Sequence, residues 1–136
     1  MLLVNKRCWA ALFLALSTPA VAQEVLLVVQ SSPLAGFDYH EAATHWEAMK
    51  VGDALSLVRE PDNSHDSKAI RVEWQGYKLG YVPRSENDAV AWAMDRGQRL
   101  SARISQLKQD QNPRRRIEFE VYVESADAPL PASALP

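Results

Sequence analysis

The chain has 136 residues, a length that suits one domain, and its 47% hydrophobic and 24% charged content is that of an ordinary globular protein. This composition excludes a fibrous or a disordered protein. The 17 acidic residues outnumber the 15 Lys and Arg residues, so the formal net charge is −2. The balance excludes a strongly basic nucleic-acid binder, and any contact with nucleic acid needs a local basic patch.

Residues 1–22 have the pattern of a secretory signal peptide. Lys6 and Arg7 form a short positive region, Trp9–Leu16 is an apolar run, and Ala20–Ala22 is a small-x-small cleavage site. The alternative is a membrane anchor, which we disfavour because the apolar run is too short to span a bilayer. We therefore expect cleavage after residue 22, export to the periplasm or beyond, and no membrane span in the mature protein.

This cleavage also fixes the charge and thiol content of the mature chain. Removing Lys6 and Arg7 lowers the basic count from 15 to 13 against 17 acidic residues, which gives a net charge of −4 with His neutral. Cys8 lies within the signal segment, so the mature chain has no cysteine. A disulfide and a thiol nucleophile are therefore excluded for the exported protein.

The first elements after the signal segment are predicted to be two strands and a helix. Glu24–Gln30 is a plausible strand that Ser31–Pro33 breaks, and Leu34–Tyr39 is a candidate second strand. The segment Glu41–Met49 has apolar and aromatic residues at helical spacing. We expect a short helix there, covering one end of the fold.

The stretch Leu55–Pro83 has the sequence pattern of a compact β unit, because runs of alternating apolar residues are separated by a polar loop and a tight turn. Pro61 cannot donate to a ladder and ends the first run, and Asp62–Lys68 is rich in turn-forming residues. The stretch therefore predicts a strand, the polar loop, a second strand, a turn at Gln75–Gly76 and a third strand. The first strand has Leu55 and Leu57 on one face, the second has Ile70, Val72 and Trp74, and the third has Leu79 and Tyr81.

The clearest predicted helix follows Pro83. Ser85 and Asp88 have the spacing of a capping box, and Gly97 is well placed as the C-terminal stop. Its apolar stripe consists of Val90, Ala93 and Met94, widened by Ala89 and Trp92.

Two alternating strands and a tail complete the chain. Leu100–Ile104 and Ile117–Val123 alternate apolar and polar residues and are joined by the polar connection Lys108–Arg116. Residues 126–136 are rich in Pro and Ala, so we expect a disordered tail there. The predicted domain, residues 23–125, is therefore mainly β, with about six strands and two short helices.

The order of these residues resembles the HIRAN domain family. The resemblance rests on Leu57–Pro61, Asn63 and Asp66, Ala69-Ile70 and Val72, Gly76, and Leu79–Arg84. It extends back through Val51–Asp53 to Ala35–Phe37 and Tyr39, and forward to the strand near Val123. So many matches in order are a specific signal. The resemblance implies a small OB-like β-barrel. It also implies binding of single-stranded DNA, especially of a free 3′ end, as in members fused to Swi/Snf-type helicases.

The resemblance assigns a DNA-binding role, by position, to Tyr39, Asn63, Asp66, Tyr81 and Arg84. Aromatic rings can stack on unstacked bases, polar side chains can bond a terminal sugar hydroxyl, and a guanidinium can grip a phosphate. The alternative is structural. In that case Asn63 and Asp66 hold their own loop, and Tyr81 belongs to the core.

Three residues depart from the family pattern. His65 stands where the family often has the Tyr of Asn-Pro-Tyr-Asp, and His40 stands where a second aromatic residue is common. Histidine can still stack on a base and gains charge near its pKa, so the predicted site includes His40 and His65. Asp38 stands where the helicase-fused members carry a basic residue, and its carboxylate would repel phosphate.

Other chemistry has weak support in the sequence. It contains no GxSxG, P-loop or carboxylate-pair motif, so we expect neither an enzyme nor a cofactor. His40, His65 and Asp66 are weak candidates for metal ligands, should their segments converge. Lys108 and Arg114–Arg116 could follow a nucleic-acid backbone, but we favour a solvated hairpin loop for them.

These observations favour a non-catalytic nucleic-acid-binding module of the HIRAN type, acting on single-stranded DNA or DNA 3′ ends. The alternative is a periplasmic or secreted module that binds an unknown envelope protein or another ligand and has lost DNA binding. Export favours the alternative, whereas Asn63, Asp66, Tyr81 and Arg84 favour the first interpretation.

Overall fold

The computed structural model describes residues 14, 15, 17 and 27–124. The expected tail at 126–136 lies outside the described residues, as does most of the expected signal peptide at 1–22, so both stay predictions. In the described part, no helix combines the length and the apolar character needed to cross a membrane.

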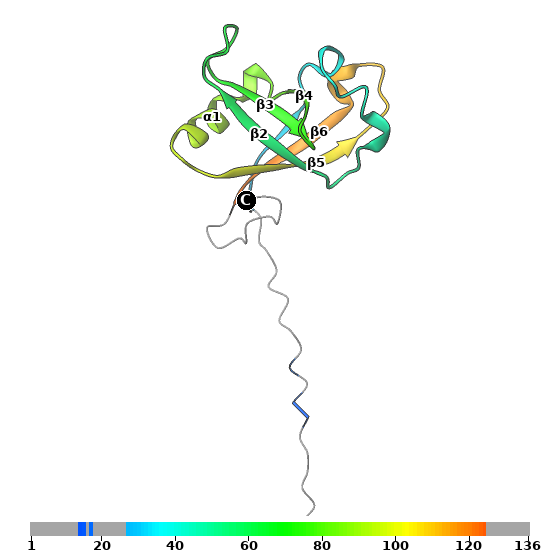
Figure 1. Ribbon diagram of the computed structural model, residues 1–136, viewed down its shortest axis with the longest axis vertical. Helices are drawn as coiled ribbons and strands as arrows, with labels where there is room; N and C mark the ends of the chain where they lie inside the picture. Colours follow the sequence, from blue (N-terminus) through cyan, green and yellow to red (C-terminus); the bar gives the residue numbers. More distant parts are fainter. Residues whose placement is uncertain (1–13, 16, 18–26, 125–136) are drawn as a thin grey trace, which may run out of the picture.

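Six antiparallel strands form one curled sheet in the order β1-β6-β5-β2-β3-β4 (Figure 1). They are β1 (Leu27–Pro33), β2 (Ala54–Glu60), β3 (Ala69–Trp74), β4 (Tyr77–Tyr81), β5 (Leu100–Leu107) and β6 (Ile117–Val123). Strand β2 joins the two halves of the sheet, because Ala54 and Leu55 pair with β5 while Ser56–Glu60 pair with β3.

The two edges of the sheet meet at a single backbone bridge. Ala35, just after β1, and Tyr81, at the end of β4, each donate an N–H to the other's carbonyl at 2.9 Å. Gly80 permits this approach, since a Cβ at that position would collide with the carbonyl oxygen of Ala35. The bridge closes the sheet into a small OB-like barrel, which confirms the predicted fold class.

Three strands carry one extra residue each, and these bulges let the sheet curl. The extra residues are Val29 in β1, Leu79 in β4 and Ser105 in β5. The bulge in β4 corrects the predicted alternation, in which Leu79 and Tyr81 share a face. Leu79 and Gly80 are both buried, whereas Tyr81 turns away from the core and is partly exposed.

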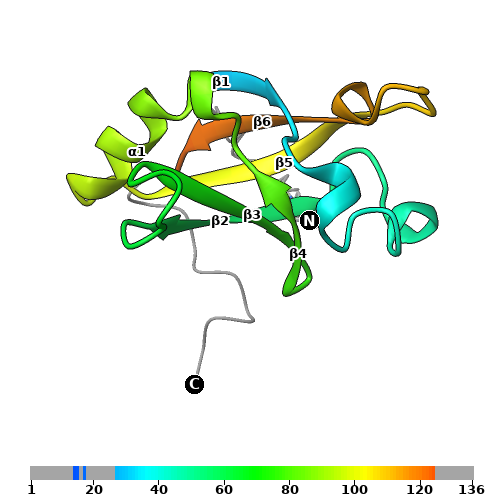
Figure 2. The ribbon, with the colours of Figure 1, turned by 90° about the horizontal axis from the view of Figure 1, so that it is seen from above.

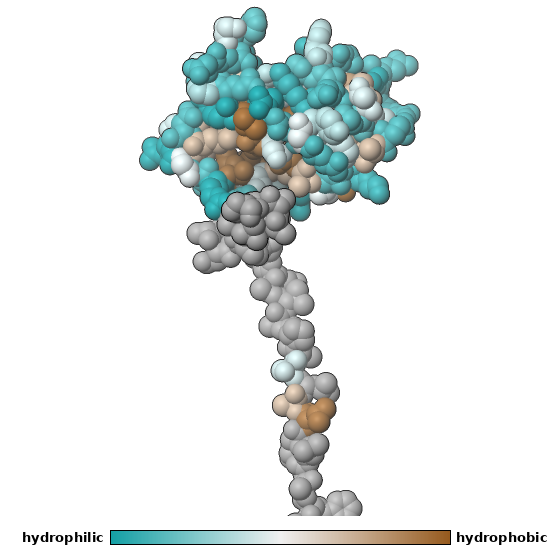
Figure 3. Space-filling view, in the orientation of Figure 1, coloured by the Kyte–Doolittle hydropathy of each residue, from teal (hydrophilic) through white to brown (hydrophobic). Residues whose placement is uncertain are grey.

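The interior of the barrel is apolar. Its largest fully buried hydrophobic side chains are Phe119, Leu34, Ile70, Leu79, Ile104, Ile117, Val72 and Val121. Ser32 and Asn87 are the buried polar residues of the described part, and both side chains are hydrogen-bonded. One face of the molecule is largely hydrophilic with a small hydrophobic patch (Figure 3), as expected when most apolar side chains lie inside.

The predicted strand Leu34–Tyr39 is wrong, because the chain turns sharply after Ala35. Gly36 has φ +82°, and the 3₁₀ turn η1 (Phe37–Tyr39) follows it. The predicted break at Ser31–Pro33 is also wrong, since these residues extend β1. Pro33 is tolerated there because β1 is an edge strand of the sheet.

The predicted helix Glu41–Met49 is replaced by turns and the 3₁₀ turn η2 (Trp46–Ala48). Two neighbouring side chains of this segment have different anchors. His45 stacks on Tyr77 with ring centroids 3.9 Å apart, whereas Trp46 packs edge-to-face against Phe37 at 5.7 Å. Tight turns allow both contacts to form, whereas a helix this short is only marginally stable by itself. Figure 2 shows these turns at the end of the barrel opposite the helix α1 (Asp88–Asp95).

The predicted capping box of α1 is wrong. Ser85 lies in the 3₁₀ turn η3 (Arg84–Glu86), and the N-cap residue is Asn87, whose side chain makes no capping hydrogen bond. The side chain of Asn87 instead donates to Asp66 at 2.7 Å, because Asn87 is buried against the 62–68 loop.

The remaining predictions for α1 are partly right. Val90 is buried and Met94 packs against the core, but Trp92 is 62% exposed and Ala91 faces the interior in its place. Gly97 ends the helix as predicted. Its N–H bonds the carbonyl of Met94, and the next N–H, of Gln98, bonds that of Ala93, as in a Schellman motif.

Because Gly80 lies against the carbonyl of Ala35, Gly80→Ala should destabilise the protein by about 3 kcal/mol or more. Urea unfolding of purified protein measures the effect. The matched control is Gly97→Ala, where nothing obstructs a Cβ but φ is +83°, and there the loss should be about 1–2 kcal/mol. Equal losses at both positions would contradict the role assigned to the bridge.

Candidate functional site

A pocket of 630 Å³ lies beside the Ala35–Tyr81 bridge, and we call it the bridge pocket. Three segments far apart in sequence form it, namely the end of η1, the 62–68 loop, and β4 with the residues that follow. Its lining residues are Ala35, Tyr39, His40, Asn63, His65, Asp66, Ala69, Lys78, Tyr81, Val82 and Arg84. All seven residues predicted from the sequence are among them.

The 62–68 loop is held by its own side chains. Asn63 Oδ1 accepts from the backbone N–H groups of His65 (2.9 Å) and Asp66 (3.2 Å). Asp66 Oδ1 accepts from the N–H of Lys68 at 2.9 Å, and its Oδ2 accepts from Asn87. Asn63 and Asp66 therefore have the loop-holding role of the structural alternative, and each Asp66 oxygen keeps lone-pair capacity for a further donor.

The carboxylate of Asp66 stays ionised. Burial by itself would raise its pKa, but the hydrogen bonds from the Lys68 backbone and Asn87, with the nearby charge of Arg84, bring the pKa below its ordinary value. The pocket therefore presents a fixed hydrogen-bond acceptor at this position.

Glu60, at the end of β2, links the loop to the barrel wall. Its Oε1 accepts from Asn63 (3.1 Å) and from the hydroxyl of Tyr81 (2.9 Å), and its Oε2 accepts from Arg71 (2.7 Å). Burial opposes ionisation of Glu60, but these three hydrogen bonds outweigh it and hold its pKa below the ordinary 4.5. One carboxylate thus fixes both the loop and the ring of Tyr81.

The aromatic groups of the pocket differ in exposure. Tyr39 is 87% exposed at the rim, whereas the ring of Tyr81 is half-buried and meets the His40 ring edge-to-face at 5.6 Å. Burial, together with the neighbouring charge of Lys78, lowers the pKa of His40 below 6.5. The imidazole of His40 is therefore uncharged at neutral pH.

Lys78 is the charged pocket residue that the sequence prediction missed. Its ammonium nitrogen lies 4.6 Å from the centre of the Tyr81 ring, a cation–π contact. Strict alternation puts Lys78 and Tyr81 on opposite faces, and the extra residue Leu79 brings them to the same one. An isolated glycine within a strand pattern signals a bulge, so Gly80 was the available clue.

Two cations, Lys78 and Arg84, therefore line the pocket together with polar acceptors. His40, His65 and Asp66 also share the pocket, but within the described residues no group of three His, Cys, Asp or Glu side chains is placed to hold a metal ion. These three side chains thus converge without forming a metal site.

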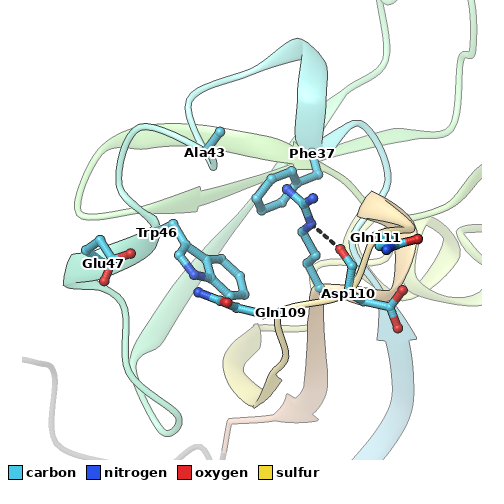
Figure 4. Close-up of a pocket in the computed structure, with 8 residues that line it drawn as sticks. Phe37, Ala43, Trp46, Glu47, Gln109, Asp110 and Gln111 are labelled. Atoms are coloured by element: carbon cyan, nitrogen blue, oxygen red, sulfur yellow. Dashed lines mark hydrogen bonds between the residues drawn. The ribbon is translucent and has the colours of Figure 1, made fainter.

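A second pocket, of 460 Å³, lies between the 37–47 segment and the β5–β6 connection (Figure 4). Phe37 and Trp46 form its aromatic wall, and Glu47, Gln109 and Asp110 lie around it. None of the seven predicted residues lines this pocket.

The model of the HIRAN domain matches residues 27–126. The chain belongs to the HIRAN domain family. A solved structure of a protein from Lactobacillus plantarum is 30% identical to this HIRAN domain, with a TM-score of 0.65 over 73% of this chain and 95% of that one.

Two further proteins are similar to this chain. The crystal structure of the HIRAN domain of human HLTF has a TM-score of 0.56, covers 75% of this chain and 80% of that one, and is 17% identical, so the likeness shows the fold alone. The Fanconi-associated nuclease 1 homolog of Oryza sativa subsp. japonica is 33% identical over 73 residues, which are 51% of this chain. The match spans only 7% of that rice protein.

Ionisation of Glu60 should make the stability of the folded protein depend on pH. The pKa of Glu60 is lower in the folded protein than in the unfolded chain, so its contribution to stability is full above about pH 4.5 and is lost as the pH falls through the folded pKa. Glu60→Gln should be less stable than wild type by about 1–2 kcal/mol at neutral pH, and the difference should shrink in acid.

Urea unfolding at a series of pH values measures this difference. Tyr81→Phe is the companion variant, because it removes one of the three hydrogen bonds to Glu60 and leaves the carboxylate in place. Its stability should begin to fall at a higher pH than that of wild type. A Glu60→Gln variant with the same pH dependence as wild type would contradict the linking role of Glu60.

Proposed function

We propose that this HIRAN domain is a non-catalytic module that binds single-stranded nucleic acid in the bridge pocket. The observation that carries the proposal is the convergence of three sequence-distant segments on one pocket that combines an exposed aromatic ring, polar acceptors and two cations. Single-strand binding uses this combination, because bases stack on aromatic faces and cations follow the phosphates.

Each group has a role that its geometry allows. Tyr39 offers a bare ring to a base, since the side chain is 87% exposed. Arg84, exposed at the rim, can take a phosphate, and half-buried Lys78 can take a second anionic oxygen deeper in the pocket. A 3′-terminal hydroxyl can donate to Asp66, whose ionised carboxylate is held in place by its hydrogen bonds.

The proposal of binding without catalysis rests on the sequence, which has no nucleophile motif and no metal-ligand spacing. One relative is called a nuclease, but the matched segment is a small fraction of it. That activity is therefore not assigned to this domain.

Binding of a labelled single-stranded oligonucleotide, measured at two salt concentrations, tests the proposal. Arg84→Ala should weaken binding at all sequences and reduce the salt slope by about one phosphate contact. Tyr39→Ala should cost about 1–3 kcal/mol of binding free energy by removing the stacking face. Trp92→Ala is the matched control, because Trp92 is an exposed aromatic residue that does not line the bridge pocket.

Comparison of free and blocked 3′ ends then tests end recognition. Equal affinity for both ends would remove the role proposed for Asp66. Failure of every oligonucleotide to bind at low salt would remove the nucleic-acid function and leave the envelope interaction module as the surviving hypothesis.

His40 adds a pH dependence to binding. His40 gains its charge only below its ordinary pKa of 6.5, because burial and Lys78 oppose protonation. If the imidazole of His40 contacts phosphate, binding should strengthen as the pH falls from about 7.5 to 5.5, with most of the gain at the acid end. The double variant His40→Ala/His65→Ala should lose this gain, and an unchanged pH profile would exclude contact between these residues and phosphate.

A further inference from the structure

A groove of 530 Å³ adjoins the bridge pocket on the other side of Tyr39. The two hollows share the lining residues Ala35, Tyr39 and Arg84, so they lie next to each other with these three residues at their border. The groove is lined by residues of η3, by Pro113 and Arg114 of the 3₁₀ turn η4 (Pro113–Arg115), and by the segment from Pro33 to Tyr39. We call it the adjoining groove.

The structure separates the three consecutive arginines of the β5–β6 connection. The Nε–H of Arg116 donates to the carbonyl of Asp110 at 2.7 Å, and the guanidinium lies 5.0 Å from the centre of the Phe37 ring. Arg115 is exposed but lines neither the bridge pocket nor the adjoining groove. Arg114 lines the adjoining groove, and its side chain is exposed.

The adjoining groove thus has an arginine on each of two walls, Arg84 from η3 and Arg114 from η4. It also contains two carboxylates. Glu86 accepts a hydrogen bond from buried Ser32 at 2.7 Å, which directs its carboxylate toward the barrel wall. Asp38 is exposed and lines the adjoining groove but not the bridge pocket, so its charge opposes a phosphate at that position.

We propose that a single strand bound in the bridge pocket continues past Tyr39 into the adjoining groove, where Arg114 binds a phosphate of a neighbouring nucleotide and Asp38 weakens that contact. This inference rests on the proposed function and extends it. Tyr39 stands at the border of the two hollows, so its ring can stack on a base while Arg84 and Arg114 hold phosphates on either side.

The proposal predicts a dependence on ligand length. A dinucleotide fills the bridge pocket alone, whereas a hexanucleotide also reaches the adjoining groove. Arg114→Ala should therefore weaken hexanucleotide binding about threefold to tenfold at low salt and reduce its salt slope by about one, with dinucleotide binding unchanged. Asp38→Asn should strengthen hexanucleotide binding and also leave the dinucleotide unchanged.

The matched control is Arg115→Ala, which removes the same charge one residue away. The backbone N–H of Arg114 donates to Asn112 Oδ1 at 3.1 Å, and alanine keeps this bond, so the turn should survive the Arg114 substitution. Thermal unfolding checks that all three variants fold as wild type does.

The outcomes distinguish a failure of the path through the adjoining groove from a failure of the proposed function. Failure of wild type to bind either oligonucleotide removes the proposed function. If wild type binds both, equal effects of Arg114→Ala and Arg115→Ala on the hexanucleotide overturn the path through the adjoining groove and leave the bridge pocket as the binding site. A loss confined to Arg114→Ala and to the longer ligand supports the path.

Discussion

The backbone bridge between Ala35 and Tyr81 is the constraint on which both the barrel and the bridge pocket depend. It joins the two sheet edges through a reciprocal pair of hydrogen bonds, at a point where only glycine fits at position 80. The same Tyr81 donates its hydroxyl to Glu60, which in turn holds Asn63. Closing the barrel therefore also fixes the ring and the loop that line the pocket, so stability and site geometry are coupled.

A second set of polar contacts anchors the far side of the pocket. Buried Asn87, at the start of α1, donates to Asp66, and Ser32 of β1 donates to Glu86 of η3. Because unpaired buried polar groups are costly, these contacts give the segment between β4 and α1 one favoured position. That segment carries Arg84, so the position of an exposed cation depends on hydrogen bonds made by its neighbours in the chain.

The sequence predicts most strands, because apolar residues alternate wherever one face of the barrel is wet, as in Ile117–Val123. The seven pocket residues were found through the order of a family motif, which constrains position more strongly than local propensity does. Lys78 was missed because the register shift at Leu79 appears only when β3 and β4 pair. The strand and the helix predicted for the 34–48 region were wrong for a similar reason, since contacts between aromatic rings that are not adjacent in the sequence determine its turns.

An acidic protein can still offer a binding site for an anion, because local rather than total charge acts at short range. The carboxylate of Glu60 is already engaged by Arg71 and Tyr81, and that of Asp66, which lines the pocket, by Asn87 and a backbone N–H. Lys78 and Arg84 then supply the local positive charge. Contact between nucleic acid and an acidic protein needs a local basic patch, and here that patch depends on the bulge in β4 and on the buried side chain of Asn87. The residue counts alone do not predict it. Under the proposed function, a patch of two cations would limit the electrostatic part of the affinity, so base stacking on Tyr39 would supply much of the binding.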